Sequence, residues 1–287
     1  MISEHIFVSS SCVNNNRIGD SVLQLAQAGY KNIELSGGTN LYDDWKSDLI
    51  RLMREFGLRY RCHNYFPPPS EHFVLNLSAS NDNIRKRSME HVEAAINLSR
   101  DLGATEYGIH AGFRFLPDHK KLGKKFTASP LDSEDAAIER FASAWCVLKS
   151  YAENQGIKLY VENNVFSKAN RISFGANNPF LATDSGSIEK LAQACNVHLL
   201  LDVAHLKVSC ATLGLCFEKE LSALMPKTDY LHFSDNNGTA DTNQGIKIGS
   251  PLYQQLRKFD LQNKTITLEV YDDSLAHSME SVKSLIG

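Results

Sequence analysis

The sequence predicts an α/β fold, a single-domain (β/α)8 TIM barrel. Eight short apolar runs, most of them ending in a polar or ionisable residue, alternate with longer segments in which apolar residues recur every three or four positions. Such alternation is typical of parallel βαβ units, and strands that are apolar throughout are buried on both faces of a sheet. The simplest closed arrangement of eight units is a barrel.

The predicted strands are the eight apolar runs, and they cover residues 6–8, 32–35, 60–63, 107–110, 159–162, 199–202, 230–233 and 266–269. Helical periodicity is clearest in four intervening segments, at residues 45–56, 89–96, 138–152 and 275–286. At four places a glycine follows a helical segment and precedes a strand, where left-handed backbone ends a helix without a Cβ clash: Gly29, Gly57, Gly103 and Gly156.

The chain length of 287 residues is compatible with two domains of roughly 150 residues or with one barrel of about 250. No Ser/Gly/Pro-rich linker divides the chain, so we expect one domain over residues 1–287. Two connections are long, residues 114–131 after the fourth strand and residues 165–187 after the fifth. Loops longer than about 12–15 residues are usually lids or binding loops. Both leave the strand ends at which barrel enzymes build their active sites.

The charge balance excludes an overall positive surface. Thirty Lys and Arg residues against 33 Asp and Glu residues leave a formal net charge of -3, which disfavours nucleic acid and anionic membranes as partners. No apolar run approaches the roughly 18 residues of a membrane span, and the first residues lack the features of a secretory signal, which predicts a cytoplasmic protein. The six cysteines form no C-x-x-C pair, so we expect free thiols.

Seven of the eight predicted strands end in a carboxylate or an imidazole: Glu34, His63, His110, Glu162, Asp202, His232 and Glu269. The carboxyl ends of parallel strands meet at one mouth of a barrel, so these side chains converge. Buried carboxylates repel one another unless a cation neutralises them, which favours a divalent metal. Glu162, Asp202, His232 and Glu269 provide a mostly oxygen shell, which suits manganese or magnesium, with cobalt or zinc tolerated through the histidine.

Short motifs surround these strand ends in a fixed order: Ile33-Glu34, His63, His110-Ala111-Gly112, Val161-Glu162-Asn163, Asp202-Val203-Ala204-His205, His232-Phe233-Ser234-Asp235 and Leu268-Glu269. The ordered set covers nearly the whole chain and resembles the xylose isomerase-like barrel superfamily. That superfamily contains sugar isomerases, ketose 3-epimerases, inosose dehydratases and the endonuclease IV family. The resemblance implies that Glu162, Asp202, His232 and Glu269 are the metal ligands, and that His205 lies beside the metal or a substrate oxygen.

Four residues are candidates for substrate binding: His63, His110, Lys168 and His205. His63 and His110 could bind substrate, ligate a second metal or be satisfied by neighbouring carboxylates, and we expect substrate contact. Lys168 follows Glu162 by six residues, where ketose 3-epimerases carry a second glutamate, and this departure disfavours that specific activity. For Glu34, orientation of loop groups, an ion pair with arginine and a direct catalytic role all stay open.

The pattern predicts a divalent-metal-dependent isomerase or epimerase that acts on a sugar or sugar derivative by proton transfer next to a carbonyl. Glu162 and Glu269 are the expected catalytic residues, one removing the carbon-bound proton and the other returning it. The expected partner is a small-molecule carbohydrate, and assembly into a homo-oligomer stays open.

Three other functions are compatible with the same ligands. An inosose-type dehydratase uses the same proton abstraction, an abasic-site endonuclease of the endonuclease IV type uses three metals, and a barrel can keep its ligands as a binding or regulatory protein. The endonuclease pattern places a D-x-H pair after strand seven, whereas this chain has Asp241-Thr242-Asn243. An amide is a poor zinc ligand, which disfavours the endonuclease.

Each of the two long loops has two possible roles. The loop after strand four either clamps a phosphate or acidic sugar or is a solvated basic run, and its basic residues are Arg114, His119, Lys120, Lys121, Lys124 and Lys125. The loop after strand five either covers the substrate with Phe166, Phe174 and Phe180 or packs those rings on the barrel rim.

Overall fold

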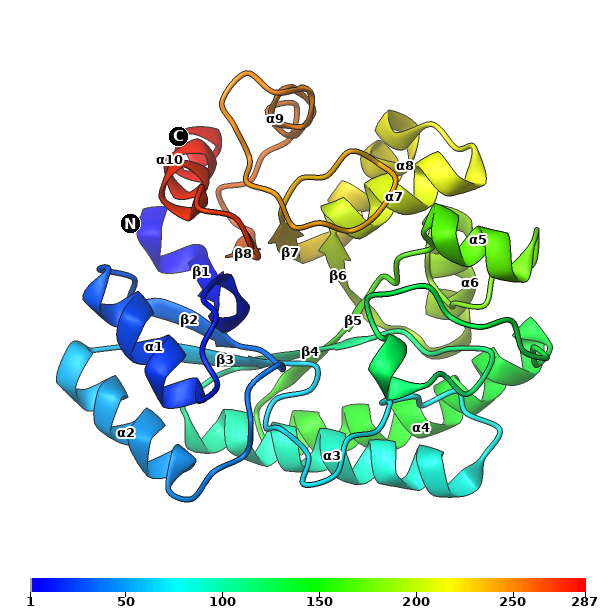
Figure 1. Cartoon of the computed structure of the whole chain (residues 1–287), viewed down its shortest axis with the longest axis horizontal. Helices are drawn as coiled ribbons and strands as arrows, with labels where there is room; N and C mark the ends of the chain where they lie inside the picture. The colour runs from blue at the N-terminus through cyan, green and yellow to red at the C-terminus, as the bar shows by residue number, and fades with distance from the viewer. Residues whose placement is uncertain (1) are drawn as a thin grey trace.

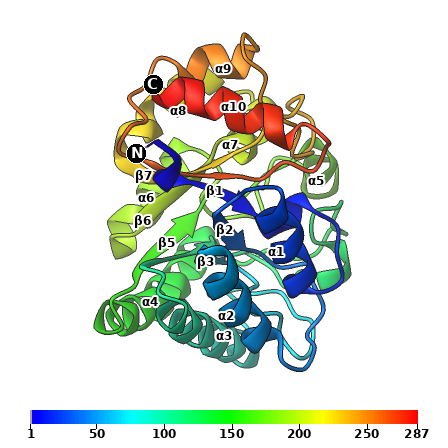
Figure 2. The same ribbon diagram turned by 90° about the vertical axis from the view of Figure 1, so that its left-hand side faces the viewer.

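The computed structural model describes residues 2–287 and shows a closed barrel of eight parallel strands, ordered β1 to β8 around the ring (Figure 1). The strands are β1 (Ile6–Ser9), β2 (Asn32–Leu35), β3 (Arg59–His63), β4 (Glu106–His110), β5 (Lys158–Glu162), β6 (His198–Asp202), β7 (Thr228–Phe233) and β8 (Thr265–Leu268). All eight predicted strands are confirmed, and β1 pairs with β8 to close the ring. The last helix of the chain therefore lies close to the first strand (Figure 2).

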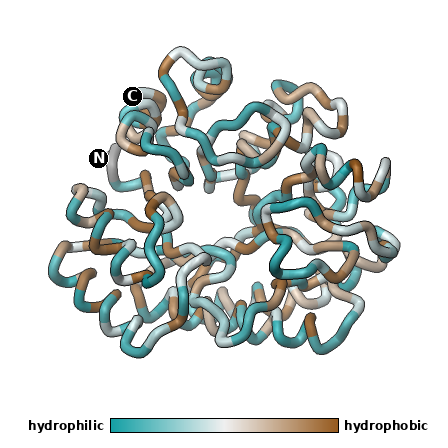
Figure 3. The backbone as a smooth tube through the Cα atoms, viewed as in Figure 1, coloured by the Kyte–Doolittle hydropathy of each residue, from teal (hydrophilic) through white to brown (hydrophobic). Residues whose placement is uncertain are grey.

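Helices cover the outside of the barrel. They are α1 (Ile18–Gln27), α2 (Trp45–Phe56), α3 (Asp82–Asp101), α4 (Glu134–Asn154), α5 (Lys168–Phe174), α6 (Ser185–Cys195), α7 (Val203–Leu213), α8 (Phe217–Leu224), α9 (Pro251–Leu256) and α10 (Leu275–Ile286), and short 3-10 turns lie at Ile2–His5, Ser10–Cys12, His119–Lys121 and Met225–Lys227. Hydrophobic and hydrophilic residues alternate along these helices, as expected for helices with one face on the barrel (Figure 3). Within the described residues, no helix is both long and apolar enough to cross a membrane.

Alternation of side chains along the strands determines what the barrel contains. Residues two positions apart on a strand point to the same face. Tyr160, Leu200 and Tyr230 pack together inside the barrel, and each lies two residues before an ionisable residue near the end of its strand. The ionisable side chains of β5, β6 and β7 therefore point inward, directly above an apolar layer.

The connection after β5, predicted as a long loop at residues 165–187, contains helical structure that the sequence did not predict. It contains the helix α5, and α6 already begins at Ser185. Ser167 caps α5 by accepting a hydrogen bond from the Asn170 backbone, and Phe174 at its end is buried. A seven-residue helix is too short to show a repeated apolar spacing, which is why periodicity did not reveal it. The loop after β4 contains only the 3-10 turn His119–Lys121.

The loops after β3, β4 and β5 are joined to one another. One joint is a cluster of aromatic rings, here called the loop aromatic cluster, in which Val74 packs with Phe113, Phe115, Phe126, Phe166, Phe174 and Phe180. The second joint is the buried Asn76, whose amide nitrogen donates to the carbonyls of Phe113 and Phe115 at 3.1 and 3.2 Å. The rings predicted at positions 166, 174 and 180 thus hold the loops together, and Phe180 also lines the cavity described below.

All six cysteines are free, as predicted. Cys62 and Cys210 are buried, so they act as small apolar side chains of the core.

Gly112 provides a test of how tightly these loops pack. A Cβ atom at this position would lie 2.0 Å from Ser78 Oγ and 2.9 Å from Asn76 Oδ1, two buried groups that hydrogen-bond to each other. Gly112→Ala is expected to lower the free energy of unfolding by about 1–3 kcal/mol, because it overpacks the site and disturbs a buried hydrogen bond. Urea unfolding measures the change.

Gly186→Ala is the matched control. Gly186 lies in the first turn of α6, and a Cβ there would meet only Asp184 Oδ1 at an ordinary 3.4 Å. This variant should unfold at the wild-type urea concentration or slightly above it, since alanine favours a helix over glycine by roughly 0.5–1 kcal/mol. Equal stability of Gly112→Ala and the wild type would contradict the proposed packing.

Candidate active site at the barrel mouth

A cavity of about 620 Å³ lies over the carboxyl ends of the strands. Its lining includes His63, His110, His205, Asp241 and Glu269, which come from five different strands or the loops that follow them. This is the face at which barrel enzymes place their active sites. Three of the predicted strand-end residues, His63, His110 and Glu269, thus lie around one cavity.

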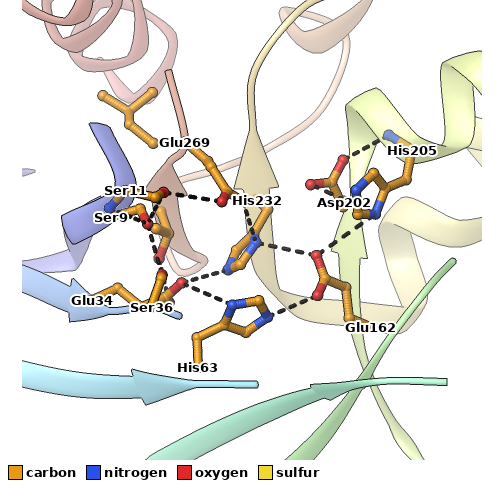
Figure 4. A network of polar contacts seen from close by, with 12 residues as sticks. Ser9, Ser11, Glu34, Ser36, His63, Glu162, Asp202, His205, His232 and Glu269 are labelled. Carbon is orange, nitrogen blue, oxygen red and sulfur yellow. Dashed lines mark hydrogen bonds and ion pairs between the residues drawn. The ribbon is translucent and has the colours of Figure 1, made fainter. Parts of the chain in front are cut away.

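Glu162, the last residue of β5, lies at the centre of the site. Its side chain is fully buried and faces four imidazoles, three of which, His63, His205 and His232, are seen in Figure 4. Oε2 lies 2.7 Å from His63 Nε2 and 3.1 Å from His110 Nδ1. Oε1 lies 3.2 Å from His232 Nδ1 and 3.7 Å from His205 Nδ1. The carboxylate is thus shared among groups from β3, β4, β7 and α7.

Asp202 ends β6 and also caps α7. Its Oδ1 accepts a hydrogen bond from the His205 backbone at 2.7 Å. Asn163 holds the backbone on both sides: its side-chain oxygen accepts from the Asp202 amide at 2.7 Å, and its side-chain nitrogen donates to the Asp202 carbonyl at 3.0 Å. These contacts fix the position of the carboxylate and leave Oδ2 directed at the site.

His205 stands at the start of α7 with both ring nitrogens facing oxygen atoms. Nδ1 lies 2.9 Å from the Asn163 carbonyl, and Nε2 lies 3.1 Å from Asp241 Oδ2. Because both partners are acceptors, the ring is arranged to donate two hydrogen bonds. Burial alone would lower the pKa of His205, but Asp202 and Asp241 outweigh it and raise that pKa well above its ordinary value.

His232 on β7 is oriented by Glu34 on β2. The Nε2 atom lies 3.0 Å from Glu34 Oε1, while Glu34 Oε2 accepts hydrogen bonds from Tyr230 and, at 2.8 Å, from Thr267. This arrangement leaves His232 Nδ1 facing Glu162. A carboxylate behind a histidine is the usual way in which the ligand nitrogen of a metal-binding imidazole is oriented.

Glu269 directly follows β8 and presents one oxygen to the same place. Its Oε1 accepts hydrogen bonds from Ser11 at 3.1 Å and from Tyr271 at 2.8 Å. Its Oε2 lies 3.6 Å from His232 Nδ1. Figure 4 shows Ser9, Ser11 and Ser36 linked on the outer side of this carboxylate.

The residues fit a divalent cation. Glu162, Asp202 and His232 are buried, and each offers a ligand atom within 4.8 Å of the others. Glu162 Oε1 and His232 Nδ1 are buried, and neither has a hydrogen bond of good geometry among the described residues. Two overlapping trios have the same spacing, Glu34 with His63 and His232, and His63 with His110 and Glu162. Carboxylate oxygens and an imidazole left without partners in a buried site are the donor set that such a cation requires.

The charges in this cluster depend on one another. Burial alone would raise the pKa of Glu162, but His110, His63 and His232 hold it well below its ordinary value. Burial lowers the pKa of His110 to about 4, despite Glu162 beside it, with His205 and His63 adding to the decrease. His110 is therefore neutral at pH 7 and able to accept a hydrogen bond.

The structure brings together seven of the eight predicted site residues: His63, His110, Glu162, Asp202, His205, His232 and Glu269. Lys168 does not join them. It is the first residue of α5, its side chain is exposed, and it does not line the cavity. The residues directly before and after it, Ser167 and Ala169, do line the cavity and carry no charge.

Several contacts were outside the predicted set. Ser11 and Tyr271 hold Glu269, and Asp241 contacts His205. Ser11 follows the first predicted strand and Tyr271 follows the last, so proximity to a strand end was the available signal for both. Asp241 lies in a long connection after β7. Its only signal in the sequence was its position in Asp241-Thr242-Asn243, the segment that corresponds to the D-x-H pair of endonuclease IV.

Comparison with solved structures shows the same fold throughout the chain. A D-tagatose 3-epimerase-like protein has a TM-score of 0.72 with 18% identity, covering 98% of this chain and 97% of the other. A protein from Thermus thermophilus, soaked with ZnCl2, has a TM-score of 0.65 with 18% identity, covering 98% and 97%. A D-allulose 3-epimerase from Methylomonas sp., in complex with D-allulose, has a TM-score of 0.63 with 14% identity, covering 99% and 93%.

Identities this low establish the fold alone. No protein with a curated description matches the sequence significantly. A family model, however, matches residues 22–285, which is nearly all of the chain. The chain therefore belongs to the xylose isomerase-like TIM barrel family.

Proposed function

We propose that this protein is a divalent-metal-dependent isomerase or epimerase that transfers a proton next to the carbonyl of a sugar or sugar derivative. The observation that carries the proposal is the pair of glutamates at the barrel mouth. Glu162 Oε1 and Glu269 Oε2 come from different strands and face the same atom, His232 Nδ1, at 3.2 and 3.6 Å. Two carboxylates beside one small volume can remove a proton from a bound carbon acid and return it.

Glu162, Asp202, His232 and Glu269 would hold the metal. Three carboxylates and one imidazole suit manganese, magnesium or cobalt, and zinc is compatible with the histidine. When bound, such a cation polarises a carbonyl and acidifies the neighbouring carbon-bound proton. The solved relatives support this chemistry, since they include sugar 3-epimerases and a protein soaked with zinc.

The two glutamates are suited to act as bases. Burial alone would raise their pKa values, but neighbouring histidines outweigh burial and lower both, so both carboxylates are ionised near neutral pH. Transfer on one face of the substrate carbon gives aldose–ketose isomerisation, and transfer between opposite faces gives epimerisation. His63, His110 and His205 would bind substrate hydroxyl and carbonyl oxygens, with neutral His110 as an acceptor and His205 as a donor.

Deuterium exchange tests the proposed reaction class. A panel of aldoses, ketoses and cyclitols is incubated with the protein and Mg²⁺ or Co²⁺ in D2O and followed by NMR. We expect enzyme-dependent deuterium incorporation at a carbon next to a carbonyl for at least one sugar. Loss of water from a cyclitol would replace the proposal with a dehydratase, and absence of exchange in the whole panel would contradict proton transfer.

Metal binding is expected to depend on the proposed ligands and on Glu34, the carboxylate that contacts His232 Nε2. Asp202→Ala should lose most bound Mn²⁺. Glu34→Gln should weaken Mn²⁺ binding about 10–100-fold, the usual effect of removing a partner of a ligating histidine. Equilibrium dialysis with elemental analysis measures both. Glu189→Gln is the control, because this exposed carboxylate on α6 pairs with Lys227 and, within the described residues, forms no ion pair with any proposed ligand. Full metal occupancy in Asp202→Ala would contradict the assignment.

Turnover should separate the proton-transferring residues from those that position the substrate. Glu162→Gln and Glu269→Gln nearly preserve side-chain shape but remove the base, so kcat at saturating metal is expected to fall by a factor of about 10² or more. His205→Asn should retain more activity than either. Normal turnover in Glu162→Gln together with an inactive His205→Asn would reverse these roles.

The protein is expected not to cleave abasic DNA. His205 and Asp241 meet at 3.1 Å, but the neighbouring side chain is Asn243, whose amide nitrogen, when oriented to donate, lies 2.9 and 3.1 Å from the two Asp241 oxygens. An amide in this place is a weak zinc ligand. A duplex with one abasic site, supplied with zinc and manganese, should show only background cleavage on a gel. Efficient nicking 5′ to the lesion would favour the endonuclease.

A further inference from the structure

We infer that the cavity contains a second subsite for an anionic group, a phosphate or a carboxylate, carried by the substrate at the end remote from the reacting carbon. This inference rests on the proposed sugar chemistry at the barrel mouth and adds the charge of the substrate to it. The subsite, here called the basic subsite, is formed by His72, His119, Lys124 and Lys125, all of which line the cavity.

Charges of opposite sign lie on opposite sides of the cavity. Among the residues of its lining, the carboxylates are Asp241 and Glu269, in the connections after β7 and β8, and the lysines are Lys124 and Lys125, in the connection after β4. In a closed ring of eight strands in sequence order, β4 is directly across from β8 (Figure 1). A substrate that spans the cavity therefore meets carboxylates at one end and ammonium groups at the other.

Two histidines extend the basic side toward the loop after β3. The rings of His72 and His119 stack with centroids 5.9 Å apart and planes at 14°, and they join the loops after β3 and β4. Asp118 Oδ1 lies 3.8 Å from His119 Nδ1, and Asp118 caps the 3-10 turn by accepting from the Lys120 backbone at 3.0 Å. Asp118 does not line the cavity. The two imidazoles thus line the same cavity as Lys124 and Lys125.

The backbone that carries the two lysines is anchored on both sides. Lys124 donates a backbone hydrogen bond to the Lys121 carbonyl at 2.9 Å. Directly after Lys125, the backbone of the buried Phe126 donates to Asn170 Oδ1 at 2.9 Å and accepts from Ser173 Oγ at 2.7 Å. The ring of Phe126 belongs to the loop aromatic cluster. The lysines of the basic subsite are therefore attached to a positioned loop.

The lysines of this loop differ in whether they line the cavity. All four lysines of this loop are exposed, but only Lys124 and Lys125 line the cavity, and Lys120 and Lys121 do not. Lysine and imidazole N–H groups are strong partners for phosphate and carboxylate oxygens.

The size of the cavity agrees with a substituted sugar. Its volume of about 620 Å³ lies within the range of about 300–1,000 Å³ that holds drug-sized ligands, which are larger than a free monosaccharide. A phosphate or carboxylate at the far end of the carbon chain would occupy the space next to the basic subsite while the reacting carbon lies at Glu162 and Glu269.

Binding of inorganic phosphate tests the subsite independently of any sugar chemistry. The dissociation constant is measured by calorimetry in EDTA for the wild type and for two double variants. Lys124→Ala/Lys125→Ala is expected to weaken phosphate binding at least tenfold, and the matched control Lys120→Ala/Lys121→Ala to bind as the wild type does. Equal affinities in both double variants would overturn the inference, even if deuterium exchange confirms the proposed reaction. Circular dichroism verifies that both variants are folded.

The source of the anion is tested with three probes that share a carbon skeleton: D-fructose, D-fructose 6-phosphate and D-fructuronate. We expect at least one anionic probe to bind tenfold more tightly than D-fructose, and this preference to disappear in Lys124→Ala/Lys125→Ala but persist in the control variant. Preference for the phosphate or for the carboxylate identifies the group. Tightest binding of the neutral sugar would contradict the inference.

Discussion

The fully buried carboxylate of Glu162 is the constraint on which the site depends. An ionised carboxylate without partners is strongly destabilised in a protein interior. Here it faces imidazoles from three other strands and one helix, and two of them are held in turn by a second carboxylate, His232 by Glu34 and His205 by Asp241. The cluster is stable only as a whole, because removing any one partner leaves charge or a polar atom unsatisfied. The cation of the proposed function would replace some of these internal ion pairs.

The layer below the site explains how such a polar cluster is tolerated in the barrel. Tyr230, two residues before His232, donates to Glu34 and stacks under the guanidinium of Arg61, which lies 4.4 Å from the ring centroid. Arg61 pairs with Glu106 near the other end of the barrel. Polar side chains therefore occupy inward-facing positions from the mouth of the barrel toward its other end, and aromatic rings such as that of Tyr230 lie between them. Packing and electrostatics orient the same side chains, so His232 has little freedom to turn away from Glu162.

The loops extend this rigid mouth into a cavity with two different ends. The loop aromatic cluster and Asn76 bind the connections after β3, β4 and β5 into one unit. Burial of these rings stabilises the loops without using the residues of the strands. The proposed chemistry at the strand ends and the proposed recognition of an anionic group by the loops therefore depend on different parts of the chain. Fixed strand ends with variable loops are the general reason that barrels support many reactions.

The sequence by itself determined the eight strands, the barrel class and the convergence of Glu162, Asp202, His232 and Glu269. These follow from short apolar runs that alternate with segments of helical periodicity and from ionisable residues at the ends of those runs, and both signals are local in the chain. Only the tertiary structure decided that Glu34 orients His232, that Ser11 holds Glu269 from 258 residues away, and that Lys168 faces outward. It also decided which lysines of one loop line the cavity. Such contacts depend on barrel closure and on loop conformation, and neither leaves a periodic pattern in the sequence.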